Sequence, residues 1–114
     1  MGKPVALGYL RKDVSGVAQT WHENQIRSLA KRSGYNLAKI IVFSADTEQP
    51  IDALIGAARR IGADAVFTFS AAHFDEEGIP SELTKVVDVV TVSPEHTHAR
   101  WSLHPSRWNK KGSV

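Results

Sequence analysis

Side chains that could carry out acyl- or phosphoryl-transfer chemistry gather directly after the apolar segments of this sequence. Arg11, Asp13 and Ser15 follow the first such segment, and Ser70 and His73 follow the third. A serine hydroxyl beside a histidine can form an activated nucleophile, and an arginine stabilises negative charge that develops on a phosphoryl group. If the apolar segments are parallel strands, their carboxyl ends share one edge of the sheet, where ligands collect. The polar groups expected at that edge are 11–15, 44–47, 70–73 and 93–95.

The pattern of apolar residues predicts strands and helices in alternation. Four short apolar runs are typical of strands, and three stretches with apolar residues at helical spacing follow the first three of them. Strands that alternate with helices form a mostly parallel sheet with right-handed crossovers. We therefore predict one three-layer α/β domain with a mostly parallel, four- to five-stranded sheet and helices on both faces. The expected strands cover 4–10, 36–43, 63–69 and 88–93, and the expected helices cover 20–33, 50–60 and a short stretch from Pro80.

Local signals indicate where the first helix starts and how the sheet ends. Thr20 and Glu23 have the spacing of a capping box, so the helix is expected to begin at residue 20, after a loop over 11–18. Trp21 falls on the apolar side of this helix and is expected in the core. Residues 97–101 are expected to return as a short antiparallel edge strand.

Length and composition indicate one small domain followed by a basic tail. The 114 residues include no cysteine, which excludes a disulfide, a thiol nucleophile and a cysteine-based zinc site. No signal-peptide pattern is present and no apolar run approaches the roughly 20 residues of a membrane helix, so we expect a cytoplasmic protein without membrane contact. Up to Ala99 there are ten Lys and Arg against twelve Asp and Glu, whereas the chain from Arg100 onward holds four basic residues and no acid. We divide the chain into a domain over 1–101 and a tail over 102–114.

The basic tail is the candidate for contact with nucleic acid. Lysine and arginine bind phosphate, and an exposed tryptophan among them can stack on a base. Arg27, Lys31 and Arg32, on the outer face of the first helix, could add to the contact. Weak, nonspecific nucleic-acid binding is therefore one alternative function. The candidate residues are Arg100, Arg107, Trp108, Lys110 and Lys111.

Four sequence motifs resemble the N-terminal catalytic domain of serine recombinases, the resolvase and invertase family. Residues 7–11 (LGYLR) are similar to the family's opening strand, and residues 25–35 are similar to its glutamine-containing helix. Residues 47–55 resemble the start of its next helix, and residues 62–67 resemble the entry to its third strand. The motifs keep the family's order and cover about residues 4–93. The resemblance implies a resolvase-like fold, in agreement with the apolar pattern.

The same resemblance implies that most of the family's catalytic residues are replaced. The serine that attacks the DNA phosphate corresponds to Asp13, and the two arginines that stabilise the transition state correspond to His73 and Glu76. Only Arg11 and Gln25 of the core set remain. Phosphoryl transfer needs positive charge around the equatorial oxygens, and two carboxylates would oppose it. We therefore expect no DNA strand cleavage.

These observations favour a non-catalytic binding or regulatory module, with a protein partner or a second copy of the chain as its expected target. The alternative is an enzyme with altered acyl- or phosphoryl-transfer chemistry, in which Ser15 or a Ser70–His73 pair would act. No glycine-rich phosphate loop is present. His96 and His98 are interpreted as exposed histidines, so we expect neither a cofactor nor a metal. The remnant cleft consists of Arg11, Asp13, Ser15, Gln25, Ser70, His73 and Glu76.

Overall fold

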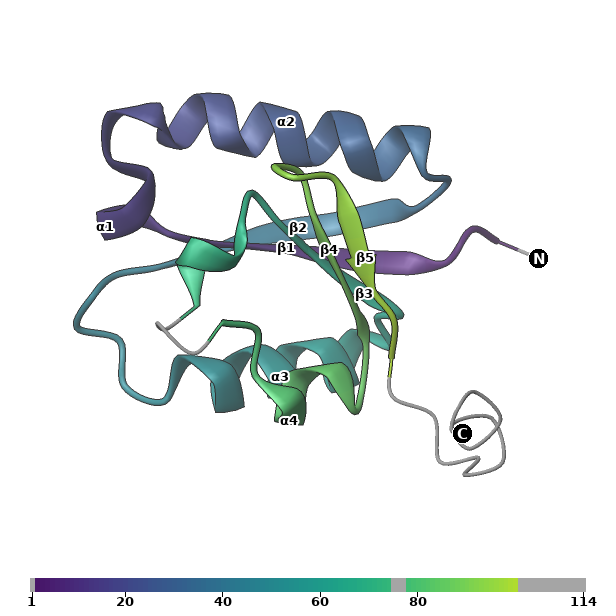
Figure 1. The fold of residues 1–114 in the computed structure, drawn as a ribbon. Helices are drawn as coiled ribbons and strands as arrows, with labels where there is room; N and C mark the ends of the chain where they lie inside the picture. The colour runs from purple at the N-terminus through teal and green to yellow at the C-terminus, as the bar shows by residue number, and fades with distance from the viewer. Residues whose placement is uncertain (1, 75–77, 101–114) are drawn as a thin grey trace, which may run out of the picture.

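The computed structural model describes residues 2–74 and 78–100, which form a three-layer α/β domain (Figure 1). Five strands make one sheet in the order β2-β1-β3-β4-β5. Strands β1 to β4 run parallel and β5 runs antiparallel to β4, so the predicted fold class and its antiparallel edge strand are confirmed. The strands are β1 (Val5–Arg11), β2 (Asn36–Phe43), β3 (Ala65–Thr68), β4 (Asp88–Thr91) and β5 (His96–His98). The helices are α1 (Lys12–Ser15), α2 (Gln19–Arg32), α3 (Pro50–Ile61) and α4 (Ser81–Thr84), with 3₁₀ turns η1 (Gly16–Ala18) and η2 (Ala71–His73).

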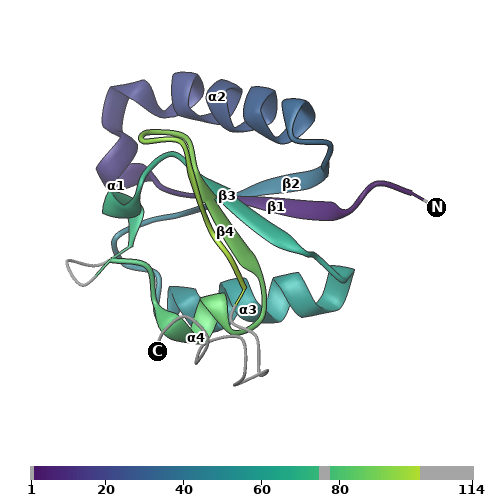
Figure 2. The same ribbon diagram turned by 45° about the vertical axis from the view of Figure 1, so that its right-hand side comes forward.

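Both faces of the sheet are covered, which explains why its central strands are mostly apolar. Helix α2 lies on one face, and α3 and α4 lie on the other (Figures 1 and 2). Successive strand residues point to opposite faces, so Leu10 packs with α2 whereas Tyr9 packs on the α3 side. The core on the α2 side consists of Ala6, Leu10, Ile26, Leu29, Ala30, Ala65, Phe67 and Val90. The core on the α3 and α4 side consists of Leu7, Tyr9, Leu54, Ala57, Ala58, Val66, Phe74, Leu83, Val87 and Val89.

Proline and glycine set the bounds of α3 as local chemistry predicts. Pro50 occupies the first turn of α3, where its missing N–H leaves no helical hydrogen bond unmade. Gly62 ends the helix in the left-handed conformation, with φ 66°, which a residue without Cβ adopts at little cost. β3 then begins at Ala65. This stretch of sequence carries the chain from the α3 side back into the sheet.

Three expectations for the start of α2 are wrong. The segment 11–18 is not a loop, because α1 and η1 continue almost directly into α2. The capping box does not form, since α2 begins at Gln19 and its N-cap, Ala18, offers no side-chain hydrogen bond. Instead, Nε2 of Gln19 donates to Oε2 of Glu23, one helical turn later, at 2.9 Å. Trp21 is 55% exposed rather than part of the core.

Within residues 2–74 and 78–100, no helix combines the length and the apolar character that crossing a membrane requires.

Candidate functional site

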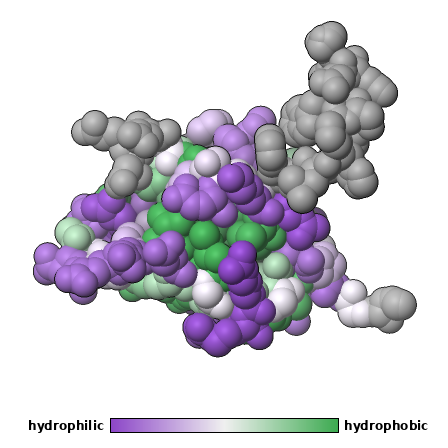
Figure 3. All heavy atoms as spheres, turned by 90° about the horizontal axis from the view of Figure 1, so that it is seen from below, coloured by the Kyte–Doolittle hydropathy of each residue, from purple (hydrophilic) through white to green (hydrophobic). Residues whose placement is uncertain are grey.

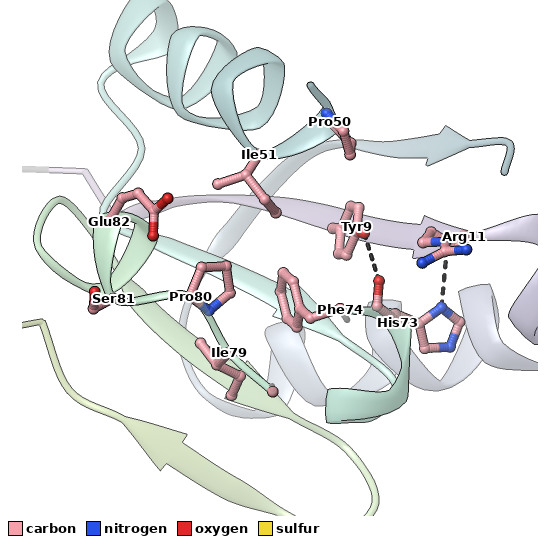
Figure 4. A pocket seen from close by; sticks show the side chains of 11 residues that line it. Tyr9, Arg11, Pro50, Ile51, His73, Phe74, Ile79, Pro80, Ser81 and Glu82 are labelled. Atoms are coloured by element: carbon pink, nitrogen blue, oxygen red, sulfur yellow. Dashed lines mark hydrogen bonds between the residues drawn. The ribbon is translucent and has the colours of Figure 1, made fainter. Parts of the chain in front are cut away.

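Two hydrogen bonds fasten η2 to the carboxyl end of β1. The backbone N–H of Arg11 donates to Nδ1 of His73 at 2.9 Å. The phenol of Tyr9 donates to the backbone carbonyl of His73. Both bonds are drawn in Figure 4, where the His73 ring lies beside Arg11 and points away from Phe74. Arg11 and His73 therefore meet at the sheet edge where a ligand site was expected.

Arg11 is bound by the carboxylate of Asp13, two residues further along the chain. Nη2 of Arg11 lies 2.7 Å from Oδ2 of Asp13, and Nε donates to Oδ1 at 3.2 Å. The hydrogen bonds and charge of Arg11 lower the pKa of Asp13, so the carboxyl is ionised at neutral pH. A bidentate pair of this kind places a full negative charge against the guanidinium.

His73 is a buried, neutral histidine whose basic nitrogen is already occupied. Burial lowers the pKa of His73 to about 4, with the charges of His22 and Arg11 adding to the effect and Asp13 opposing it. Because Nδ1 accepts the Arg11 N–H, the neutral ring carries its proton on Nε2. In the part of the chain that the structure describes, Nε2 has no hydrogen-bond partner. His73 therefore has no lone pair to offer as a general base in this arrangement.

A serine–histidine pair forms at this corner, but its histidine was not anticipated from the sequence. Oγ of Ser15 lies 2.8 Å from Nδ1 of His22, and Ser15 is only 6% exposed. The His22 ring stacks on Phe69 with centroids 3.9 Å apart and meets the His73 ring edge-on at 5.7 Å. Burial lowers the pKa of His22. The signal in the sequence was the spacing of seven residues between Ser15 and His22, which places two side chains on one helical face, but only if 11–18 is helical.

The remaining cleft residues do not join this cluster. Oγ of Ser70 accepts the backbone N–H of Ala72 at 3.3 Å and so caps η2 rather than pairing with the His73 ring. Gln25 is half-buried on α2, and no hydrogen bond joins it to the cluster among the described residues. Glu76 lies outside the described residues. The seven predicted residues therefore do not form one constellation.

A pocket of about 440 Å³ lies between the start of α3 and the segment that leads into α4. Figure 3 views the molecule from this side and shows apolar side chains gathered at the centre of the face, with hydrophilic ones around them. Ser15 is not one of the lining residues, so the serine and Arg11 do not share this pocket. The lining residues are Tyr9, Arg11, Pro50, Ile51, His73, Phe74, Gly78, Ile79, Pro80, Ser81 and Glu82.

The structure describes the histidine pair His96 and His98 but only the first of the basic residues proposed to bind nucleic acid. The rings of His96 and His98 lie edge to face with centroids 4.5 Å apart. Among the described residues no three His, Asp or Glu side chains converge as a metal site would require. The backbone N–H of Arg100 donates to Asp88, and its guanidinium donates to the Val86 carbonyl at 3.4 Å. The other nucleic-acid candidates lie outside the described residues; they are Arg107, Trp108, Lys110 and Lys111.

Comparison of the chain with protein-family models, with curated proteins and with solved structures finds no significant match.

Proposed function

We propose that this chain is a non-catalytic binding or regulatory module, a degenerate relative of the serine-recombinase catalytic domain without recombinase activity. The observation that carries the proposal is the bidentate pair between Arg11 and Asp13, at 2.7 and 3.2 Å. The motifs that carry the resemblance supply the interior strand β1 and its last residue, Arg11. Asp13, the residue at the position of the family's serine, binds the retained Arg11.

Electrostatics explain why the retained arginine does not rescue catalysis. Phosphoryl transfer is accelerated by cations preorganised around the transferring group, and a single such arginine is worth about three to five orders of magnitude in rate. Asp13 satisfies Arg11 with negative charge instead of substrate. His73 is neutral at physiological pH and its Nδ1 is taken by the backbone. Among the described residues, the cleft therefore has a carboxylate in place of the family's serine, and the positive charge of Arg11 is paired with it.

Exposed apolar side chains support a role in contacting another protein. Val17 is fully exposed, and Val14 and Trp21 are 37% and 55% exposed, all within the short stretch from α1 to the first turn of α2. Apolar residues that cluster on a surface mark interaction sites more often than isolated ones do. Sedimentation velocity of the wild type and of Trp21→Ser tests self-association. A concentration-dependent dimer that Trp21→Ser weakens would identify this stretch as the self-contact.

Incubation with supercoiled and linear duplex DNA tests the absence of recombinase chemistry. We expect no nicking and no covalent protein–DNA adduct on a denaturing gel. An adduct that disappears in Ser15→Ala would overturn the proposal, because it would show that Ser15 replaces the lost nucleophile. Thr20→Ala, an exposed change on the same helical stretch, is the matched control.

One observation favours a second function, acyl transfer by Ser15. The 2.8 Å contact between Oγ of Ser15 and Nδ1 of His22 is the geometry of a nucleophile with its base. Against it, Ser15 is 6% exposed, so a substrate would reach the hydroxyl only after α1 moves. Covalent labelling by a fluorophosphonate probe, followed by peptide mapping, decides the matter. Labelling of Ser15 that His22→Ala abolishes would establish this activity.

A further inference from the structure

We propose that the pocket between α3 and α4 binds a small organic cation with an apolar body, such as an aryl- or alkylamine. This proposal deepens the proposed function, on which it rests, by giving the binding module a ligand. The pocket volume of about 440 Å³ falls in the range of small-molecule sites, about 300–1,000 Å³. It is distinct from the Ser15–His22 pair, which contributes no lining residue.

The aliphatic walls of the pocket suit an apolar body. Tyr9 and Phe74 form the floor, with their rings stacked at 4.9 Å and 25°. Both rings are almost completely buried in the core, and the bond from Tyr9 to the His73 carbonyl fixes the phenol. Ile51 and Ile79, both half-buried, face the floor from the two sides, as Figure 4 shows. Because the rings of the floor are almost completely buried, the apolar contacts open to a ligand come chiefly from the aliphatic walls, Ile51 and Ile79.

The charges that reach the pocket favour a cation. Arg11 and Glu82 lie at opposite ends of the lining in Figure 4. The charge of Arg11 is compensated by Asp13 at 2.7 Å. Glu82 has no hydrogen bond or ion pair within the residues that the structure describes. Among the described lining residues the uncompensated charge is therefore negative, and an ammonium group beside the carboxylate of Glu82 complements it.

The same arrangement disfavours the anionic ligands that Arg11 would suggest. An anion at Arg11 would displace or face the carboxylate of Asp13, and the body of that anion would extend toward Glu82. A neutral ligand gains only the apolar contacts. An amine gains those contacts and a charge-assisted hydrogen bond to Glu82.

Three ligands with one apolar body and different charges test the proposal. Phenethylamine is a cation at neutral pH, 2-phenylethanol is neutral and 3-phenylpropionate is an anion. Each is titrated into the ¹⁵N-labelled full chain, and binding is followed by the amide shifts of Tyr9, Phe74 and Ser81. We expect the amine to bind more tightly than the alcohol and the alcohol more tightly than the carboxylate. We expect the shifts to centre on these lining residues.

Three variants assign the preference to the pocket. Glu82→Gln should weaken amine binding by about fivefold, the effect of losing one partly exposed charge contact, and leave alcohol binding unchanged. Glu95→Gln removes an exposed carboxylate from the turn before β5 and should change neither. Ser81→Trp places an indole on the exposed rim of the pocket and should abolish binding of all three ligands, while the spectrum keeps the dispersion of the folded domain.

The outcomes separate this proposal from the proposed function. Equal affinities for the three ligands, no binding by any of them, or shifts centred away from the lining residues would overturn the ligand assignment. None of those results would create a covalent DNA adduct. Conversely, an adduct would remove the non-catalytic module without changing the amine titration.

Discussion

The carboxylate of Asp13 receives two hydrogen bonds from the guanidinium of Arg11, from Nη2 at 2.7 Å and from Nε at 3.2 Å. The two residues are separated by one residue in the sequence and lie at the junction where β1 passes into α1. The pair is local, so it forms as soon as the junction folds. This one interaction pairs the charge of Arg11 with the charge of Asp13.

Loss of the arginine should raise the pKa of Asp13. Arg11 lowers that pKa by hydrogen bonding and by its charge, so Arg11→Gln removes both causes. The ionised carboxylate stabilises the fold above its pKa, and this contribution disappears as the pH falls through it. A ¹³C titration of the Asp13 side-chain carboxyl measures the change. Lys12→Gln, next in sequence, is the control and should leave the Asp13 titration in place.

The stability of the domain should fall between pH 6.5 and about pH 4 because of His73. The pKa of His73 is about 4 in the folded chain, and an unfolded histidine has a pKa near 6.5. The unfolded state therefore binds more protons in this window, which lowers the free energy of unfolding as the pH falls. At about 1.4 kcal/mol for each pH unit, the total loss is roughly 3 kcal/mol. Above pH 6.5 this group contributes no pH dependence.

Urea unfolding at pH 7.5, 6.0 and 5.0 measures this effect against a variant. His73→Asn keeps an acceptor for the Arg11 N–H but cannot be protonated, so its stability should vary less with pH. His22, whose pKa is also lowered, is present in both proteins, so the difference between their slopes reports His73 together with its interaction with His22. Identical slopes for the two proteins would contradict the prediction.

Two glycine-to-alanine substitutions should have opposite effects on stability. At Gly8 a Cβ would lie 2.7 Å from Cγ1 of Ile40 on β2, which forces the strands apart and should cost about 1–3 kcal/mol. At Gly56, inside α3, the nearest atom is Nη1 of Arg60 at 3.7 Å, so alanine should stabilise the helix by up to about 1 kcal/mol. Chemical denaturation compares the two. The cost of Gly8→Ala should shrink in an Ile40→Ala background, and an unchanged cost there would show that Ile40 is not the obstacle.

Two apolar residues of α3 should differ in their contribution to stability because they differ in burial. Leu54 is completely buried between α3 and the sheet, so Leu54→Ala should cost about 2–5 kcal/mol. Ile61 is 38% exposed at the end of the same helix, and Ile61→Ala should cost roughly 1 kcal/mol or less. Denaturant midpoints of the two variants give the comparison. Similar costs would mean that α3 does not pack as described.

The order and type of the elements could be predicted from sequence, because punctuation residues and apolar runs are local signals. The bounds of β2 agree with the prediction, and α3 starts at its proline. The prediction that Trp21 is buried was wrong because helical spacing does not by itself identify the centre of the buried stripe. That centre includes Ile26 and Ala30, and Ala30 lies nine residues beyond Trp21, half a turn around the helix. The packing of α2 on the sheet determines which side of the helix is buried.

The sequence could predict only the part of the candidate site that lies at the ends of parallel strands. The meeting of Arg11 with the η2 segment follows from the pairing of parallel β1 with β3. The role of His22 could not be foreseen, since it depends on α1 and η1 being helical. The pocket could not be foreseen either, because Ile51 and Ile79 carry no chemical signal of their own and meet only through tertiary packing.

β1 has two partners in the sheet, and both follow it in sequence: β2 begins at Asn36 and β3 begins at Ala65. During synthesis on the ribosome, β1 therefore emerges long before its second edge can be paired. A nascent chain that stops short of Ala65 leaves the backbone N–H and C=O groups of Ala6–Tyr9 on that edge open to another chain. An interior strand of the finished sheet is thus the segment that most needs protection from aggregation while the protein is being made.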